Sequence, residues 1–293
     1  MSIIIDSHTK VCVQGISGTG GRAHTRSMLE YGTQVVAGVA PGHGGEVIHG
    51  VPVFDTCFDA IAASGATLSV CFVGGRWALD AVLEAVTAGM GTIVCMEEFV
   101  PLLDASRMRR FCDIAGAMLI GPNCNGIVSP GKAKVGFFPP EFGRPGPIGV
   151  ISRSGTLSYG AMMAIEGEGG GESTVVGIGG AAVSGLDFVS CLKLFATDPE
   201  TKTIAIVGEI GGSREEEAAA YVAAGYPKPV VALIAGHHAP PGVAMGHAGA
   251  IATAEVGRWD AKAQALSDAG IDVVRNLEEL GRRAVERIPM QGV

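Results

Sequence analysis

The feature that most constrains the fold is a regular alternation between short apolar runs and segments with helical periodicity. Four apolar runs in the first half of the chain are Lys10 to Gln14, Gln34 to Val39, Leu68 to Val73 and Thr92 to Glu97. Segments such as Trp77 to Ala88, with apolar residues at helical spacing, lie between these runs. Continuous apolar runs separated by helices indicate parallel strands that are covered on both faces. The sequence therefore predicts an α/β protein.

A chain of 293 residues is long enough for two domains of ordinary size. Residues 126–147 are rich in Gly and Pro and show no periodicity, which predicts a linker. A second alternating series begins at Ile148 and closes with a helix that ends at Ile288, a pattern typical of a flavodoxin-like domain. We therefore predict a first domain at residues 1–125 and a second domain at residues 148–293.

The first strand ends in a glycine-rich turn, Gly15-Ile-Ser-Gly-Thr-Gly-Gly21, which is followed by a helical segment and a second strand. This unit resembles the opening of a Rossmann-like domain, but its spacing is GxxGxGG rather than GxGxxG. The second strand is followed by Ala-Pro-Gly-His rather than by an acidic residue that would bind a ribose. A nicotinamide cofactor is therefore disfavoured, and a phosphorylated adenosine ligand is preferred. A glycine turn that serves only helix packing is the alternative.

Composition narrows the class of ligand and the compartment. The net charge is -8 and the chain has no dense Lys/Arg block, which argues against a nucleic-acid surface. The chain has 45 glycines, clustered after apolar runs, so small anions are expected to be held by backbone N–H groups. The seven cysteines form no CxxC pair and are expected to be reduced core residues. The first residues have neither a basic region nor a long apolar segment, and no apolar run is long enough to span a bilayer, so we expect a cytoplasmic protein.

Three separate motifs suggest phosphoryl transfer. His247 lies in Met245-Gly-His-Ala-Gly-Ala250, where small neighbours leave the ring accessible. Upstream, an apolar strand breaks into Ser-Arg-Ser154-Gly155 before a helix, as in anion-binding helix starts. A third strand ends in Glu209 among glycines. An imidazole nucleophile, an anion cradle and an orienting carboxylate suit a phosphoryl group. The alternative is that His247 is a structural residue whose ring nitrogens are both hydrogen-bonded. Residues 215–217 are interpreted as a solvent-exposed helix start without a chemical role.

With these motifs established, the chain resembles the alpha subunits of the nucleoside-diphosphate-forming succinyl-CoA synthetase family, which includes malate–CoA ligase-like members. SRSGTL, GEIGG, MGHAGA, GPNC and the GxxG turn occur in that family's order over nearly the whole chain. The resemblance implies coenzyme A on the first domain and a phosphorylated histidine on the second. It also implies a separate beta subunit whose ATP-grasp domain binds ATP or GTP with Mg2+, and no metal site on this chain.

The resemblance also assigns roles to individual residues. His247 would be phosphorylated, and Glu209 would pair with its ring. Ser154 and Gly155 would hold the phosphoryl group, and Tyr159 would contact the carboxylic acid. The other assignments concern coenzyme A: its binding residues would be Ser17, Gly18, Thr19, Gly20, His43, Met96, Glu97 and Glu98, with Asn123 and Cys124 as further candidates near the thiol.

The chain departs from the family pattern beside the ligand sites. His43 replaces a lysine, Gly160 replaces a glutamate, and residues 181–183 replace an acidic residue and a proline. We therefore expect the phosphoryl relay to be kept, whereas the acid need not be succinate. The alternatives are the alpha subunit of a malate–CoA ligase or of another carboxylate–CoA ligase, and a non-catalytic CoA-binding homologue. A dehydrogenase is a distant third interpretation.

Overall fold

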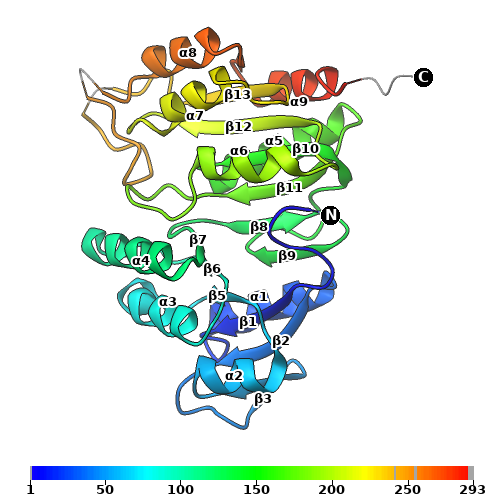
Figure 1. Cartoon of the computed structure of the whole chain (residues 1–293), viewed down its shortest axis with the longest axis vertical. Helices are drawn as coiled ribbons and strands as arrows, with labels where there is room; N and C mark the ends of the chain where they lie inside the picture. The colour runs from blue at the N-terminus through cyan, green and yellow to red at the C-terminus, as the bar shows by residue number, and fades with distance from the viewer. Residues whose placement is uncertain (1, 241, 254–255, 290–293) are drawn as a thin grey trace.

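The computed structural model describes residues 2–240, 242–253 and 256–289. Residue 1 and residues 290–293, at the ends of the two predicted domains, lie outside the described residues. Two sheets are arranged one after the other along the long axis of the molecule, each with its own helices (Figure 1). The predicted α/β fold, Rossmann-like in the first half and flavodoxin-like in the second, is confirmed.

The first sheet has the order β3-β4-β2-β1-β5-β6-β7, and all its neighbouring strands run parallel except the pair β3 and β4. Its strands are β1 (Lys10–Gln14), β2 (Gln34–Val39), β3 (Val47–Ile48), β4 (Val51–Phe54), β5 (Leu68–Cys71), β6 (Thr92–Cys95) and β7 (Met118–Ile120). Its helices are α1 (Thr19–Glu30), α2 (Cys57–Ser64), α3 (Ala78–Thr87) and α4 (Leu102–Ala115), with a short 3-10 turn at Gly75–Trp77.

The second sheet has the order β14-β13-β12-β10-β11-β8-β9. Its parallel part consists of β10 (Pro145–Ser152), β11 (Glu172–Gly177), β12 (Thr203–Glu209), β13 (Val230–Ala235) and β14 (Asp272–Val274). Its helices are α5 (Gly155–Gly167), α6 (Phe188–Thr197), α7 (Arg214–Ala223), α8 (Trp259–Asp268) and α9 (Leu277–Glu286).

Successive residues of the central strands face opposite layers, because side chains alternate along a strand. In β12, Ile206 packs in a core cluster that includes Phe188 of α6, and Val207 packs in another that includes Ala161 of α5. Both faces are buried, which explains the continuous apolar runs. Within the described residues, no helix combines the length and the apolarity needed to cross a bilayer.

Residues 126–147, predicted as a linker between the domains, contain regular structure. They contain β8 (Gly126–Ser129) and β9 (Ala133–Gly136), an antiparallel hairpin that extends the second sheet through pairing of β8 with β11. In Figure 1 the hairpin forms the edge of the second sheet that faces the first sheet. Thr33 Oγ1 donates to Lys134 O at 2.8 Å, which ties the hairpin to the first domain. Glycines interrupt the apolar pattern of this hairpin in the sequence. Gly126, Gly131 and Gly136 adopt positive φ angles, which favour glycine at these positions.

Candidate active site

His247 lies in the loop between β13 and α8, at the carboxyl end of the second sheet. Its Nδ1 lies 2.8 Å from Oε2 of Glu209, the last residue of β12, and 26% of the histidine side chain is exposed. The ring rests on the backbone of Gly180, since a Cβ there would lie 2.3 Å from Cγ of His247. The ring is therefore held on one edge and one face while it remains partly open to solvent.

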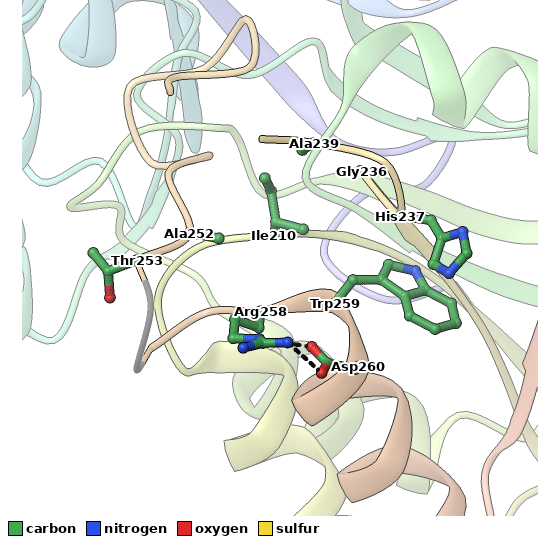
Figure 2. A pocket seen from close by; sticks show the side chains of 9 residues that line it. All are labelled: Ile210, Gly236, His237, Ala239, Ala252, Thr253, Arg258, Trp259 and Asp260. Carbon is green, nitrogen blue, oxygen red and sulfur yellow. Dashed lines mark hydrogen bonds and ion pairs between the residues drawn. The ribbon is translucent and has the colours of Figure 1, made fainter. Parts of the chain in front are cut away.

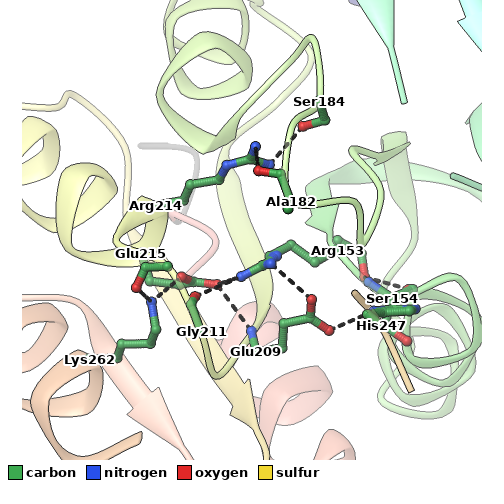
Figure 3. A network of polar contacts seen from close by, with 12 residues as sticks. Arg153, Ser154, Ala182, Ser184, Glu209, Gly211, Arg214, Glu215, His247 and Lys262 are labelled. Carbon is green, nitrogen blue, oxygen red and sulfur yellow. Dashed lines mark hydrogen bonds and ion pairs between the residues drawn. The ribbon is translucent and has the colours of Figure 1, made fainter. Parts of the chain in front are cut away.

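Glu209 is itself part of a buried polar network (Figure 3). Its Oε1 lies 3.0 Å from Nη2 of Arg153, although this ion pair is not aligned as a hydrogen bond. Arg153 also lies 3.3 Å from Oε1 of Glu215, and the other oxygen of Glu215 accepts from Lys262 at 2.5 Å. The side chains of Glu215 and Lys262 are fully buried.

The environment of His247 raises its pKa above the usual histidine range. The hydrogen bond with Glu209 is the main cause, and burial of the ring opposes it. Among more distant charges, Arg153 lowers the pKa and Glu98 raises it. Because Nδ1 faces the carboxylate, the neutral ring donates from Nδ1 and carries its lone pair on Nε2.

Helix α5 begins beside this network. Ser154 is its N-cap residue, and the Ser154 hydroxyl accepts from the backbone N–H of Leu157 at 3.2 Å. Gly155 is the first helical residue, and a Cβ there would lie 3.2 Å from Cβ of Asn125. The first amides of a helix have no acceptor within the helix, so this end attracts anions.

A cavity of about 350 Å³ lies between the first domain and the His247 loop. It is lined by carboxylates and an amide from the first domain, small residues after β11, and both neighbours of His247. Its lining residues include Glu97, Glu98, Asn123, Ala181, Ala182, Val183, Gly246 and Ala248. The structure therefore brings Glu97, Glu98 and Asn123 to the same place as the histidine loop.

A larger cavity of about 710 Å³ lies at the carboxyl ends of β1, β2 and β5. Gly15, Ser17, Gly18 and His43 line it, together with Trp77. A Cβ at Gly15 would lie 2.3 Å from the carbonyl oxygen of Phe72, so only glycine allows this close approach. Gly18 is the N-cap of α1 and has no side-chain cap, which leaves the first turn of the helix accessible.

Other candidates from the sequence lie elsewhere. Thr19 and Gly20 are exposed in the first turn of α1. Met96 is buried in the core and 3% exposed. Cys124 is also buried; it donates to Cys95 O at 3.3 Å, and burial raises its pKa to about 12.

Tyr159 lies on α5 and faces aromatic neighbours. Its hydroxyl donates weakly to Phe137 O at 3.4 Å, and its ring packs edge-on against Phe138. Burial is the main cause of its raised pKa. The next residue, Gly160, faces α9, since a Cβ there would lie 2.6 Å from Cδ1 of Leu277. The glutamate that the family resemblance leads us to expect at position 160 would therefore collide with Leu277 in this chain.

Sequence reasoning missed three residues of the network, Arg153, Glu215 and Lys262. Glu215 was expected to be solvated, but it is fully buried between Arg153 and Lys262, whose charges compensate its own. Only the position of Arg153, inside the strand-to-helix motif, was a signal that the sequence offered.

The base of the histidine loop forms a separate cavity of about 380 Å³ (Figure 2). Trp259 Nε1 donates to Ile234 O at 2.8 Å, and His237 packs edge-on against the indole ring at 4.2 Å between centroids. Arg258 is held by two contacts to Asp260. These contacts fix the point where the loop enters α8, away from Glu209.

A coenzyme A-binding domain followed by a ligase domain is the class that this fold and site define. A family model described as CoA binding domain matches residues 6–99, and one described as CoA-ligase matches residues 151–271. The cavity of about 710 Å³ lies within the first match, and the cavity of about 380 Å³ lies within the second.

Curated relatives narrow this class. A protein named succinate–CoA ligase [ADP-forming] subunit alpha from Staphylococcus aureus is 44% identical over 100% of this chain and 97% of its own length. The protein of the same name from Staphylococcus epidermidis is 42% identical over the same shares. The chain belongs to the family of ADP-forming succinate–CoA ligase alpha subunits.

Solved structures agree with the fold. ATP citrate lyase from Methanothrix soehngenii, solved with citrate and coenzyme A, matches 97% of this chain with a TM-score of 0.88 and 24% identity. The chain spans half the length of that protein. An acetyl-coenzyme A synthetase from Ca. Korarchaeum cryptofilum matches 94% of this chain and 60% of its own, with a TM-score of 0.74 and 22% identity. At these identities the likeness concerns the fold alone.

Proposed function

We propose that the chain is the alpha subunit of a nucleoside-diphosphate-forming acid–CoA ligase in which His247 carries the phosphoryl group. The observation that carries this proposal is the pairing of His247 Nδ1 with Glu209 at 2.8 Å in a ring that stays partly exposed. A structural histidine in a core would have both ring nitrogens satisfied and no open edge. The hydrogen bond between Nδ1 and Glu209 orients this ring, and Nε2 stays available as a nucleophile.

The geometry supports a two-step relay through His247. In the first step Nε2 attacks the terminal phosphorus of the nucleoside triphosphate; a P–N bond forms, the P–O bond breaks and the diphosphate leaves. Glu209 holds the Nδ1 proton and stabilises the positive charge that develops on the ring. In the second step a substrate carboxylate attacks phosphorus, the P–N bond breaks and an acyl phosphate forms. The electron pair of the P–N bond returns to Nε2, and the ring is again neutral with its proton on Nδ1 beside Glu209.

Ser154 and Gly155 are proposed to hold the phosphoryl oxygens at the start of α5. The Ser154 hydroxyl accepts a hydrogen bond from the backbone N–H of Leu157, so the N–H groups that precede it in the helix can donate to an anion. Tyr159 lies one turn further along α5 and is proposed to face the substrate side. Backbone amides stabilise a dianion without adding a cation that would bind it too tightly.

The first domain fits coenzyme A. The cavity of about 710 Å³ is large enough for part of a nucleotide. Gly15 and Gly18 let the backbone come close at its wall, while their own N–H groups donate to Val39 O and Gly15 O. We propose that Ser17, Gly18 and His43 contact the phosphates, with Thr19 and Gly20 offering the first amides of α1. Glu97, Glu98 and Asn123 would lie near the thiol end. When bound, coenzyme A supplies the thiol that takes the acyl group from phosphate.

A partner subunit is proposed to supply the nucleotide site. The relatives are named as alpha subunits, and an ATP-grasp beta subunit with Mg2+ and ATP or GTP would complete the reaction. The acid is proposed to be succinate, with malate or another small carboxylic acid as the alternative. The cavity beside the histidine loop is lined by Glu97, Glu98 and apolar residues, so the second carboxylate of a diacid would need cations from the partner.

Radiolabelling tests the proposal. The chain, co-expressed with its beta subunit, is incubated with ATP labelled in the γ-phosphate, and label that is acid-labile and alkali-stable is expected at His247. His247→Asn should abolish the label, whereas His49→Asn, at an exposed histidine of the first domain, should retain it. A panel of acids then identifies the one that discharges the label to form a CoA thioester. An unlabelled wild-type chain would leave only a non-catalytic CoA-binding role.

A further inference from the structure

We propose that Arg153 is a positioning residue for His247: it fixes the orientation of the Glu209 carboxylate that pairs with the imidazole, and it is itself fixed by Glu215 and Lys262. The inference rests on the proposed phosphohistidine function and adds to it the residues that control the partner of the histidine. Within the described residues none of the three forms a hydrogen bond or ion pair with the imidazole, so each positions it through Glu209.

The two oxygens of Glu209 have different partners. Oε2 accepts from His247, and Oε1 lies 3.0 Å from Nη2 of Arg153. Only 8% of the Glu209 side chain and 3% of the Arg153 side chain are exposed. The guanidinium at this distance compensates the buried negative charge and restricts rotation of the carboxylate.

Glu215 fixes both partners in this ion pair. Its Oε1 accepts the backbone N–H of Glu209 at 3.1 Å and lies 3.3 Å from Nη1 of Arg153. The same Nη1 donates to Gly211 O at 3.2 Å. One buried carboxylate therefore sets the backbone position of Glu209 and the position of its cation at the same time.

Lys262 extends the network to the far end of the histidine loop. It lies on α8, which begins where that loop ends, and Figure 3 shows it reaching Glu215 from the opposite side to Arg153. Its Nζ donates to Glu215 at 2.5 Å, to Glu216 at 2.8 Å and to Gly212 O at 3.0 Å. The strand end that carries Glu209 and the helix that anchors the His247 loop are thus joined through one cluster of buried charges.

This arrangement predicts the direction in which the pKa of His247 shifts when each charge is removed. A purely structural role of Arg153 would predict no such shift. The charged groups that face His247 are Glu209 on β12, Arg153 before α5 and Glu98 after β6. Removing the cation Arg153 should raise the proton affinity of the imidazole, whereas removing the anion Glu215 should lower it.

The test uses the full chain in two measurements. The first is an NMR titration of the His247 ring in the chain alone, and the second is the rate of phosphohistidine formation against pH with the beta subunit present. For Arg153→Gln we expect the titration and the acid limb of the rate to move to higher pH by about one unit. Glu215→Gln should move both to lower pH, and Arg153→Lys should restore the wild-type position.

Controls separate the possible failures. Arg283→Gln removes an arginine that pairs with Asp272, remote from the network, and should leave both profiles unchanged. If Arg153→Gln does not fold, the opposite shift of Glu215→Gln and the rescue by Arg153→Lys still decide the matter. Variants whose profiles coincide with the wild type, with only uniformly lower rates, would show that Arg153 is structural. If the wild-type chain takes no label at His247 while the NMR shifts occur, the phosphohistidine function fails and the positioning role stands.

Discussion

The imidazole of His247 lies directly against the backbone of Gly180, where a Cβ would approach Cγ of the ring to 2.3 Å. A second contact follows in the same loop, because Gly249 donates its backbone N–H to Gly180 O at 3.2 Å. The absence of a side chain at position 180 therefore determines whether the ring can occupy its place beside Glu209. Gly180 belongs to the turn after β11, which also lines the cavity next to the loop.

Gly180→Ala should displace the ring and reduce CoA thioester formation. Overpacking of this kind costs about 1–3 kcal/mol, which corresponds to a rate loss of roughly fivefold to more than a hundredfold. Steady-state assays with the beta subunit measure it. Gly167→Ala is the matched control, because a Cβ there meets nothing within 4 Å. Equal rates for both variants would contradict the packing role of Gly180.

A second glycine pair tests how the loop is held. Gly211 has a φ angle of +90° and a Cβ there would lie 2.1 Å from Gly249 O, whereas Gly212 has a φ of +61° and open space around it. Alanine at either position adds about 1–2 kcal/mol of backbone strain. Only Gly211→Ala should also release residues 242–252, seen as faster hydrogen exchange in that segment. Similar exchange in the Gly212→Ala chain would show that strain alone loosens the loop.

The pairing of His247 with Glu209 should make stability depend on pH. The folded pKa of His247 is raised by the hydrogen bond to Glu209, so this contribution is present below the unfolded pKa and is lost as pH rises through the folded value. Glu209→Gln should therefore cost more stability near about pH 5.5 than near about pH 8.5. Urea unfolding at the two pH values measures the difference. A loss that is independent of pH would mean that the pair does not titrate as described.

The cysteines should be inert in the folded protein. All seven are free and buried, and desolvation raises the pKa of Cys112 to about 11 and that of Cys124 to about 12. Because the thiolate is the reactive form, a thiol reagent at neutral pH should modify none of them until the chain unfolds. Counting modified thiols with and without denaturant checks this. Rapid labelling of Cys124 in the native chain would instead support a place for it at the thiol end of coenzyme A.

The sequence predicted the two sheets well because their strands are continuous apolar runs whose length and spacing are local properties. It missed β3 and β4, which are short, and it mistook the hairpin of β8 and β9 for a linker because positive-φ glycines interrupt the pattern. The roles assigned to His247, Glu209, Ser154 and Gly155 remain predictions. The structure does place the first two in contact.

The sequence by itself determined the order of the helices and of the parallel strands other than β4, the glycine turns and the family to which the chain belongs, because all of these depend on local residue patterns. Only the tertiary structure decided which charges are buried. Glu215 looks like an ordinary acidic residue at a helix start, yet its partner Lys262 is 47 residues away along the chain. Burial and pairing of that kind arise when distant segments pack together, and no local pattern encodes them.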